Sequence, residues 1–581
     1  MEQNITNPFQ FVSPRPTVEI HLPDGRVICG LRGADVGDFL KLLVDPISPP
    51  IVGAVVNGEL RELTYPITMD SKVRPVAMGE ADGMLIYRRS LIFLLDAAFE
   101  DLYPEAVLTI DHSVVSGGYF CRVNDPALLS ERELARLEGH MRELVDADLP
   151  FFKREVPLFE AIAYFKAKDQ DEKVRLLSHR QKDYLVLYRI GDHQDYHHGY
   201  MVPSTGYLRW FRLTNIDGGF TLQFPRRQQP TDLLAEPKYP KLLATFRQYG
   251  EWLDRLGIAS VGALDDAIQD GHIQEIILAS EALQEQHVAN IAAQIAANRD
   301  KIHIVLISGP SSSGKTTFSK RLSIQLISQG IYPFAMEMDN YFLDRDNTPL
   351  DEDGKPDFES IRALDLPRLT DDIHHLISGE SVRLPRFNFK AGHREEGETA
   401  QLQPGQIIIL EGIHGLNPEL TLEIPPEQAF RIYVSCLTQL NLDRHNRIST
   451  TDTRLIRRIV RDSMERGYSA QDTIKHWESV RRGEKNYIFP YQENADVMFN
   501  SALAYELSVL KPLAEPLLRQ VSHGTEEHIE AKRLLALLEW FLPADGDLIP
   551  DNSILREFIG GSILKDFTLW HYQTTPSTQG C

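Results

Sequence analysis

The spacing of apolar and polar residues changes along the chain, and each change predicts where an element of secondary structure begins or ends. Near the N-terminus, short stretches of strict alternation predict strands, and one stretch with apolar residues every three or four positions predicts a helix. Pro-Asp-Gly and Asn-Gly sequences between them are typical of tight turns, because proline fixes φ and glycine accepts a positive φ. The pattern predicts a β-grasp unit with strands at 17–22, 26–29 and 51–56 and a helix at 34–43.

The next segment, up to about residue 227, mixes longer helices with strands and predicts a mixed α/β domain. Its predicted helices are 90–103 and 129–145, and its predicted strands are 184–188 and 207–213. From about 239 to 298 the pattern is helical and polar, which predicts a connector rather than a further core.

From residue 302 apolar strands alternate with amphipathic helices, which is typical of a doubly wound parallel sheet. The predicted strands are 302–307, 334–338 and 407–410, with a helix at 316–328 and a last helix at 529–540. The predicted fold class is therefore multidomain α+β and α/β, with a β-grasp unit and a mixed α/β domain before the parallel-sheet domain. The predicted domain boundaries are 1–84, 85–238, 239–299, 300–515 and 516–581.

Composition narrows the functions open to this chain. Acidic residues outnumber basic ones by 83 to 61, and the resulting net charge of -22 opposes binding of nucleic acid by the chain as a whole, although a local basic patch can still bind it. The four cysteines are far apart in sequence, which argues against a disulfide framework or a cysteine-rich zinc site. No apolar run approaches the ~18 residues of a membrane span, and residues 1–9 lack the pattern of a signal peptide. We expect a cytoplasmic protein without membrane contact.

A phosphate-binding motif lies between the predicted strand 302–307 and the helix 316–328. The sequence Gly309-Pro310-Ser311-Ser312-Ser313-Gly314-Lys315-Thr316 matches G-x-x-x-x-G-K-[ST]. In such a loop the backbone N–H groups surround phosphate oxygens, Lys315 reaches the β- and γ-phosphates, and the Thr316 hydroxyl binds Mg²⁺. The strand before and the helix after it distinguish the motif from a chance Gly/Ser loop. We predict that ATP contacts this loop and Thr317, with Mg²⁺ as the cofactor.

Two acidic residues follow predicted strands of the same sheet. Asp339 comes after strand 334–338, and Glu411 comes after strand 407–410. Ligands of open α/β sheets bind at the carboxyl ends of the strands, so both acids should face the phosphates. Glu411 suits support of Mg²⁺, and Asp339 suits a general base that takes a proton from an acceptor hydroxyl. The alternative for each acid is that it only caps the next helix.

Four arginines follow the spacing i, i+3, i+4, i+7 and so share one face of a helix. They are Arg454, Arg457, Arg458 and Arg461. Like charges on one face repel by roughly a few tenths of a kcal/mol per close pair unless acids or an anion lie opposite. A triphosphate undergoing transfer is such an anion, because arginine stabilises charge on the moving phosphoryl group. The alternatives are a solvated face paired with Asp462 and Glu465, or an RNA-binding patch.

In this order, the motifs resemble the uridine–cytidine kinases. The resemblance covers about 300–512 and rests on the phosphate loop, Met338-Asp339-Asn340-Tyr341-Phe342, Leu410-Glu411-Gly412, and the arginine segment 452–467. It implies an ATP- and Mg²⁺-dependent kinase that transfers the γ-phosphate to the 5′-hydroxyl of a nucleoside. The arginine helix would form a lid over the phosphates, and self-association is implied. The implied catalytic residues are Asp339, Lys315, Arg458 and Arg461, with Arg457 binding ATP and with Thr316 and Glu411 holding the metal.

The resemblance also implies an acceptor site, and here the chain departs from the family. The implied substrate-binding residues are Tyr341, Glu359, Arg386, Phe387, Asn388, His393 and Arg466. Glu359 stands where the family has a ribose-binding aspartate, and Phe387-Asn388-Phe389 replaces an aromatic Tyr-Asp-Phe segment. The family's base-reading histidine falls at or next to Gly392, with His393 one residue late. Because hydrogen bonds to the base edge make such a pocket selective, the acceptor stays open, and phosphoribulokinase or pantothenate kinase activity remain alternatives.

The N-terminal half resembles other proteins. Residues 17–77 resemble a TGS domain, and 85–227 resemble the editing-type second domain of threonyl-tRNA synthetases through Tyr87–Leu95, Ser116–Phe120 and 202–214. The editing site looks dismantled, since the family's two helix histidines fall on Arg89 and Phe93, and its later Cys and His fall on His197 and Met201. We therefore expect no hydrolysis of mischarged tRNA, and a ligand site, weak RNA contact or a scaffold instead.

This half motivates two alternative functions. One is a nucleotide-switched RNA- or ribosome-associated regulator, and the other is a sensor for an amino acid or nucleotide. A histidine cluster in the same half, with His193, His197 and His198 beside Asp192 and Asp195, is the pattern of a metal site. We expect a solvated loop there instead, because the segment between two strands fixes no shared face.

Overall fold

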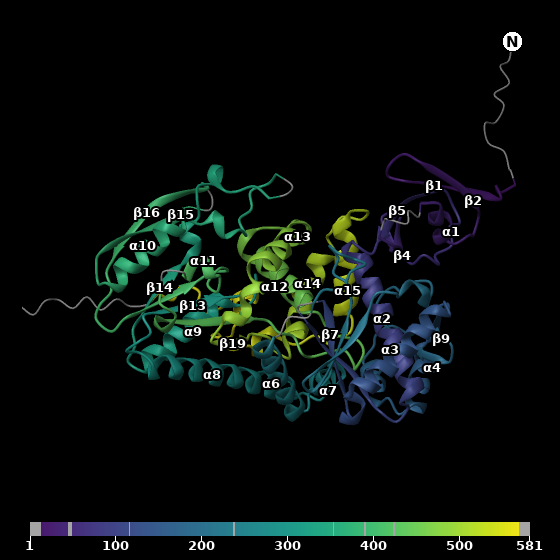
Figure 1. The fold of residues 1–581 in the computed structure, drawn as a ribbon, viewed down its shortest axis with the longest axis horizontal. Helices are drawn as coiled ribbons and strands as arrows, with labels where there is room; N and C mark the ends of the chain where they lie inside the picture. Colours follow the sequence, from purple (N-terminus) through teal and green to yellow (C-terminus); the bar gives the residue numbers. More distant parts are fainter. Residues whose placement is uncertain are drawn as a thin grey trace, which may run out of the picture.

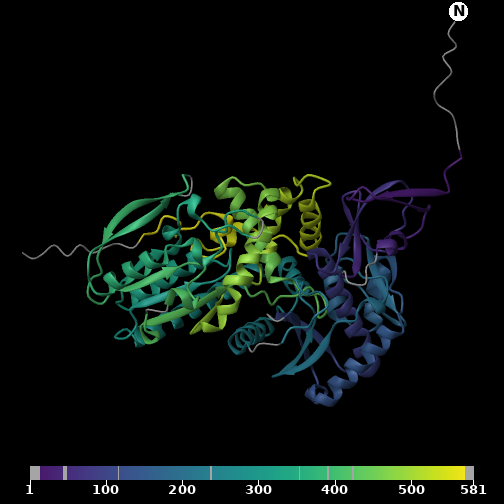
Figure 2. The same cartoon turned by 45° about the horizontal axis from the view of Figure 1, so that its top comes forward.

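The computed structural model describes residues 13–43, 49–114, 117–235, 239–351, 354–388, 391–421 and 424–568. The N-terminal half and the parallel-sheet domain lie at opposite ends of the molecule, and the C-terminal helices lie between them (Figures 1 and 2). No helix within these ranges has the length and apolar character that a bilayer crossing requires.

The N-terminal unit is a five-stranded sheet with one short helix, as the β-grasp pattern predicts. Its strands, in spatial order β2-β1-β5-β3-β4, are β1 (Thr17–His21), β2 (Val27–Leu31), β3 (Ile51–Val56), β4 (Glu59–Arg61) and β5 (Ser71–Ala77), with helix α1 at Val36–Leu40. Asn57 and Gly58 both have positive φ, 51° and 84°, between the antiparallel strands β3 and β4. The predicted Asn-Gly hairpin turn is confirmed, because only such residues adopt that backbone readily.

The second domain contains two antiparallel sheets around a buried helix. The sheets have the orders β11-β12-β7-β6 and β10-β9-β8, with β6 (Leu108–Val114), β7 (Gly118–Val123), β8 (Phe152–Pro157), β9 (Tyr184–Ile190), β10 (His193–Asp195), β11 (Arg212–Ile216) and β12 (Gly219–Gln223). The helices are α2 (Ala81–Leu102), α3 (Glu131–Asp146), α4 (Leu158–Ala167) and α5 (Asp171–Ser178). Residues 90–99 of α2 are almost all buried, in keeping with their apolar sequence.

The predicted strand 207–213 is wrong, since the strand begins only at Arg212. A 3-10 turn occupies Thr205–Tyr207 instead. The backbone of Trp210 bonds to a side chain: its N–H donates to the Tyr87 hydroxyl at 3.0 Å, and that hydroxyl donates to its carbonyl at 2.9 Å. A side chain on α2 therefore satisfies the polar groups that a neighbouring strand would otherwise satisfy.

The segment predicted as a polar connector forms three helices, α6 (Pro240–Leu256), α7 (Val261–Gln269) and α8 (Ile273–Ala297). Their apolar side chains belong to the same core as the parallel sheet: Leu253, Ile277 and Ile291 lie in one cluster with Val305 and Phe318. The segment therefore packs onto the parallel-sheet domain along one side (Figure 1).

The parallel-sheet domain has five strands in the order β14-β17-β13-β18-β19, all parallel. They are β13 (Ile304–Ser308), β14 (Pro333–Glu337), β17 (Ile407–Glu411), β18 (Ala429–Ser435) and β19 (Val497–Asn500). The helices are α9 (Lys315–Ser328), α10 (Leu366–Ile377), α11 (Pro418–Thr421), α12 (Thr450–Arg461), α13 (Ala470–Tyr487) and α14 (Glu506–Leu518). A separate hairpin joins β15 (Val382–Asn388) to β16 (His393–Ala400). The predicted multidomain class with a doubly wound sheet is confirmed.

The C-terminal segment returns to the middle of the molecule. Helix α15 (Glu526–Leu538) lies between the two halves, and the short helix α16 (Arg556–Ile559) follows. Leu534, Ile554 and Phe558 share the apolar core of the parallel-sheet domain. This burial brings Ile554 and Glu557 to the phosphate loop.

Candidate active site

The phosphate loop joins the central strand β13 to helix α9, and two positions in it require glycine. A Cβ on Gly309 would lie 1.9 Å from the carbonyl oxygen of Val434. Gly314 has φ +82°, and a Cβ there would lie 2.5 Å from Cγ2 of Ile554. Glycine therefore lets the loop close tightly in the manner that a phosphate-binding loop needs.

Two buried hydroxyls make the loop fit an anion. Ser312 and Ser313 are 4% and 0% exposed, and their Oγ atoms have no hydrogen-bond partner among the described residues. Buried hydroxyls are normally bonded, so a phosphate that accepts from them would supply the missing partner. Lys315, the first residue of α9, donates from Nζ to the carbonyl of Pro310 at 3.1 Å and so lies over the loop.

Thr316 and Glu411 form a pair of oxygen donors beside the loop. The parallel register places Glu411 opposite Ile307, and the Thr316 hydroxyl donates to Glu411 Oε2 at 3.1 Å. Hydroxyl and carboxylate oxygens are the ligands that Mg²⁺ prefers, so these residues fit that ion. Burial raises the pKa of Glu411 to about 7, and nearby Asp339 adds to the rise while Lys315 opposes it.

Asp339 and Glu359 belong to the same charge cluster. Burial raises the pKa of Asp339, whereas Lys315 and Arg466 act in the opposite direction. Burial, together with Glu484, raises the pKa of Glu359 to about 7, and Arg458 and Lys315 oppose that rise. Several desolvated carboxylates therefore surround one lysine, an arrangement in which a bound cation would stabilise their charged forms.

The arginine face of α12 meets buried glutamates. Arg454 donates twice to Glu484, at 2.8 and 2.6 Å, and Arg457 Nε donates to Glu506 at 2.5 Å. The two arginines are 1% and 0% exposed. Acids of the chain therefore balance both charges. Arg457 also donates to the backbone carbonyl of Ser312 at 3.4 Å and so lies against the phosphate loop, and its binding of ATP stays a prediction. Helical spacing predicted the shared face but contains no information on which anion lies opposite it.

The later arginines of this segment lie at the loop. Arg458 donates to the Ser311 hydroxyl at 2.9 Å and to Asp462 at 3.2 Å. Arg461 and Arg466 contact the same Asp462 carboxylate, at 3.3 and 3.4 Å. Asp462 thus holds three guanidinium groups together, close to where a phosphate would enter.

The implied acceptor residues are divided between the core and the surface. Tyr341 is buried, and its hydroxyl donates to Asp372 on α10 at 2.9 Å, so the ring packs under the site. The Asn340 side chain accepts from the backbone N–H of Phe387 at 3.3 Å, which attaches β15 to the segment that contains Asp339.

The remaining acceptor residues lie on the β15–β16 hairpin. Arg386 and His393 are exposed, and Asn388 donates to Glu395 at 2.7 Å. His393 Nε2 also lies 3.5 Å from Glu395. Phe389 falls outside the described residues. The hairpin is therefore anchored at the site by Phe387.

Two acidic residues at the loop were not predicted from the sequence. Glu484 accepts from the backbone N–H of Ser311 at 3.1 Å. Glu557, on α16, accepts from the backbone N–H and the hydroxyl of Thr317, at 3.3 and 2.8 Å. A carboxylate on a free N–H of a helix N-terminus occupies a position that suits phosphate. No local pattern could reveal Glu557, because it lies 240 positions from Thr317 in the sequence.

The expected solvated histidine loop in the second domain is wrong. His193 and His197 are 9% and 6% exposed, and β10 pairs with β9. Asp96 and Glu100 contact His193 from α2, while Asp195 bonds to Lys173 and lies 3.2 Å from His445 of the parallel-sheet domain. The polar residues therefore form a buried ionic cluster, because the other half of the chain covers this segment.

Comparisons with known proteins divide the chain in the same way. Residues 304–507 match the model of the Phosphoribulokinase / Uridine kinase family. A solved phosphoribulokinase from Rhodobacter spheroides is 17% identical, with a TM-score of 0.25, and the match covers 34% of this chain and 70% of that one.

The N-terminal region is similar to threonine–tRNA ligases. The ligase of Clostridium kluyveri is 31% identical over 204 residues and that of Desulforamulus reducens 29% over 205 residues, each covering 35% of this chain. The chain spans 32% of the length of these relatives. Both resemblances expected from the sequence are thus confirmed, and the first supports a phosphate-loop kinase: residues 304–507 match the phosphoribulokinase and uridine kinase family, whereas the N-terminal region is similar to threonine–tRNA ligases.

Proposed function

We propose that the chain is an ATP- and Mg²⁺-dependent kinase that transfers the γ-phosphate of ATP to a hydroxyl of a small acceptor, with a nucleoside 5′-hydroxyl as the first candidate. One observation carries the proposal: Lys315, Asp339 and Glu411 come together at the carboxyl ends of three adjacent parallel strands. Ligands of open α/β sheets bind at this edge. The family match over 304–507 supports the same chemistry.

The residues have distinct roles in this proposal. The loop N–H groups, the serine hydroxyls and Lys315 bind the phosphates of ATP, while Thr316 and Glu411 would hold Mg²⁺, which neutralises charge on the phosphates. Asp339 accepts the proton of the acceptor hydroxyl, because its raised pKa makes it a better base near neutral pH. Arg458 and Arg461 stabilise the charge of the phosphoryl group during transfer.

A nucleoside is the favoured acceptor because the cluster beside Asp339 has groups that suit a sugar. The Glu359 carboxylate shares charged neighbours with Asp339, so it lies where it could accept hydrogen bonds from sugar hydroxyls. The hairpin held by Asn340 and Phe387 would cover the base. A phosphorylated sugar is the other acceptor to test, as the description of the matched family includes phosphoribulokinase.

The test is phosphoryl transfer from ATP–Mg²⁺ to a panel of nucleosides, ribulose 5-phosphate and pantothenate. We expect Asp339→Asn to lower kcat by about 10²- to 10⁴-fold, as loss of a general base does, with ATP binding retained. Lys315→Ala should weaken ATP binding. The exposed Asp346 and Lys355 provide the matched controls Asp346→Asn and Lys355→Ala, which should leave activity unchanged. Wild-type kcat in Asp339→Asn would refute the assigned base.

A second function is supported by the similarity of the N-terminal region to threonine–tRNA ligases. The chain would then be a regulator that binds RNA and uses the phosphate loop as a nucleotide switch. Filter binding of tRNA over a range of salt concentrations tests it, since phosphate contacts make RNA binding fall steeply with salt. Binding that is absent, or insensitive to salt, would exclude this function.

A further inference from the structure

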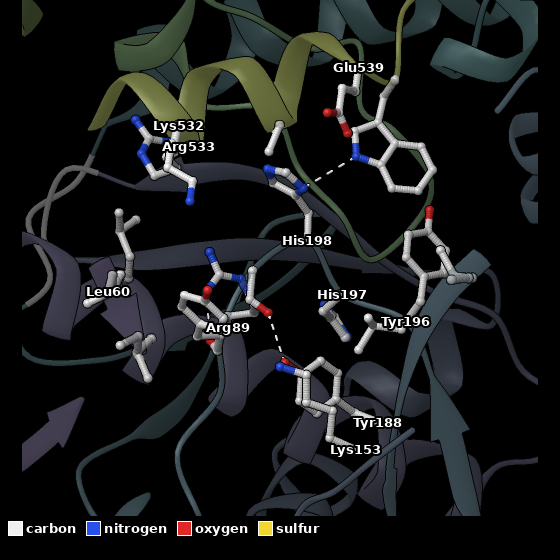
Figure 3. Close-up of a pocket in the computed structure, with 18 of the residues that line it drawn as sticks. Leu60, Arg89, Lys153, Tyr188, Tyr196, His197, His198, Lys532, Arg533 and Glu539 are labelled. Atoms are coloured by element: carbon white, nitrogen blue, oxygen red, sulfur yellow. Dashed lines mark hydrogen bonds between the residues drawn. The ribbon is translucent and has the colours of Figure 1, made fainter. Parts of the chain in front are cut away.

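Apart from the phosphate-loop site, the molecule has a cavity, here called the second cavity, between strand β4 of the β-grasp unit, the second domain and helix α15 (Figure 3). Its volume is about 360 Å³, within the range of sites for small molecules. Helix α2, strand β9, the segment 196–200, and α15 with Trp540 form its walls. It is separate from the phosphate loop, because no residue of the loop lines it.

Basic side chains outnumber acidic ones in the walls, although the chain as a whole is strongly acidic. Three lining residues are acidic and six are basic: Arg89, Lys153, Arg180, Lys182, Lys532 and Arg533. In Figure 3, Lys532 and Arg533 lie on α15 across the cavity from Arg89. A local excess of positive charge in a chain of net charge -22 indicates a site for an anion.

Four of these cations are already balanced by carboxylates: Lys153 by Glu62, Lys182 by Glu539, Lys532 by Glu59, and Arg533 by Asp452. Arg89 and Arg180 have no carboxylate partner in the part of the chain that the structure describes. Among the described residues, Arg89 donates to the backbone carbonyl of Tyr200 at 2.7 Å and Arg180 to that of Tyr184 at 3.3 Å. Burial lowers the pKa of both guanidinium groups, as expected for buried charges that lack a counterion.

The backbone makes room for Arg89. Gly199 has φ +117°, and a Cβ there would lie 2.4 Å from Cζ of Arg89. The positive φ, which side chains rarely adopt, favours glycine here, and the missing Cβ leaves room for the guanidinium beside the backbone.

Aromatic rings and an unbonded imidazole complete the walls. Trp540 stacks on Tyr196 with 5.4 Å between ring centroids, and Arg180 lies 4.3 Å above the Trp540 ring. The Nε2 atom of His197 is buried and has no hydrogen-bond partner within the described ranges. Burial lowers the pKa of His197 to about 4, so this imidazole is neutral at pH 7 and can bond to a ligand.

His198 adds a second polar group. The indole N–H of Trp540 donates to its Nδ1 at 3.3 Å, which leaves Nε2 as the protonated nitrogen and a hydrogen-bond donor (Figure 3).

We propose that this cavity binds a small phosphomonoester with a planar ring, a free nucleoside monophosphate, at a site separate from the phosphate loop. The two positive guanidinium groups of Arg89 and Arg180 suit a phosphate, which carries close to two negative charges at pH 7. The half-buried rings of Tyr184 and Tyr200 in the cavity wall suit a base, because aromatic side chains stack on planar rings. The free nucleotide is favoured over an RNA end, since the charge of -22 repels a polyanion.

The test is isothermal titration calorimetry with AMP, GMP, CMP and UMP. The protein is the full-length Lys315→Ala variant, in which the phosphate loop binds nucleotide more weakly. Adenosine, uridine and inorganic phosphate are titrated separately to divide the affinity between ring and phosphate. We expect saturable binding of at least one monophosphate, more than tenfold tighter than its nucleoside. Arg180→Gln and Arg89→Gln should each weaken it at least tenfold. Arg132→Gln, whose side chain is 93% exposed, is the matched control and should bind normally.

Several results would overturn the proposal. They are no saturable binding of any monophosphate, equal binding by Arg180→Gln, equal affinity for nucleoside and monophosphate, or binding of an RNA oligonucleotide alone. Because Arg89 is half-buried and donates to the Tyr200 carbonyl, circular dichroism melts must accompany its variant. If Arg89→Gln does not fold, the affinities of Arg180→Gln and His197→Ala for the monophosphate test the proposal in its place. Catalysis is not measured, so this test stands apart from that of the kinase activity.

Discussion

Single charged side chains decide what the phosphate-loop site can do. Burial, before any other cause, raises the pKa of Asp339 and of Glu411, and Lys315 opposes both shifts. A carboxylate with a raised pKa is a stronger base than an exposed one and yet stays able to bind a cation. The positions of the two acids could be predicted from the sequence, because each stands at the end of an apolar run that is typical of a strand.

His193 makes the stability of the second domain depend on pH. Burial disfavours its charge, but Asp96 and Glu100 more than offset this and raise the pKa of His193 to about 10. Protonated His193 therefore stabilises the fold fully below the ordinary histidine pKa of about 6.5. This stabilisation is lost as the pH rises toward 10. We expect the free energy of unfolding to fall by a few kcal/mol between pH 6.5 and pH 10.

Urea unfolding at several pH values measures this change. In His193→Gln the decline over the same range should be smaller, because the titrating group is gone. His272→Gln, at an exposed position, is the control and should keep the wild-type decline. An identical decline in wild type and His193→Gln would contradict the assignment.

Helix α16 adds to the active site a residue that the sequence did not predict. Through Glu557 it occupies the N–H of Thr317, and Ile554 just before it packs against Gly314. A carboxylate bound at the N-terminus of α9 competes with the phosphate of a nucleotide for the same donors. The C-terminal segment is therefore part of the site, although the sequence pattern places it outside the parallel-sheet domain.

Removing the charge of Glu557 tests that competition. We expect Glu557→Gln to lower the KM for ATP about tenfold, equivalent to about 1.4 kcal/mol, since a hydrogen bond to a charged group contributes that order of energy. The kcat should stay near the wild-type value. Glu105→Gln, at an exposed position, should change neither constant. An unchanged or higher KM in Glu557→Gln would show that α16 does not compete with ATP.

Elements with a strong local signal could be predicted from the sequence, and those that depend on distant partners could not. The phosphate loop and the strands beside it are dictated by local spacing, so β13, α9 and β17 lie close to their predicted positions. By contrast, 207–213 reads as a strand, but Tyr87 satisfies the backbone of Trp210. The buried histidine segment also reads as a loop, since only the other half of the chain covers it.

The two halves of the molecule are joined by charged and polar contacts as well as by apolar packing. Asp195 of the second domain bonds to His445 of the parallel-sheet domain, and Tyr196 donates to Asp443. Helix α15 adds Arg533, which both lines the second cavity and donates to Asp452 at the start of α12. The helix that contacts the phosphate loop through Arg458 is thus held, at its other end, by a residue of the cavity wall.

Arg533 is therefore expected to hold α15 against α12. It donates twice to Asp452, at 2.7 and 2.8 Å, and also to Glu530. Arg533→Gln should lower the free energy of unfolding by about 3 kcal/mol, because it leaves a largely buried carboxylate without its partner. Asp452→Asn should have a similar effect, and the double variant should lose clearly less than both single losses added together, because the two residues contribute through one shared contact. Strictly additive losses in urea unfolding would mean that the pair does not couple α15 to α12.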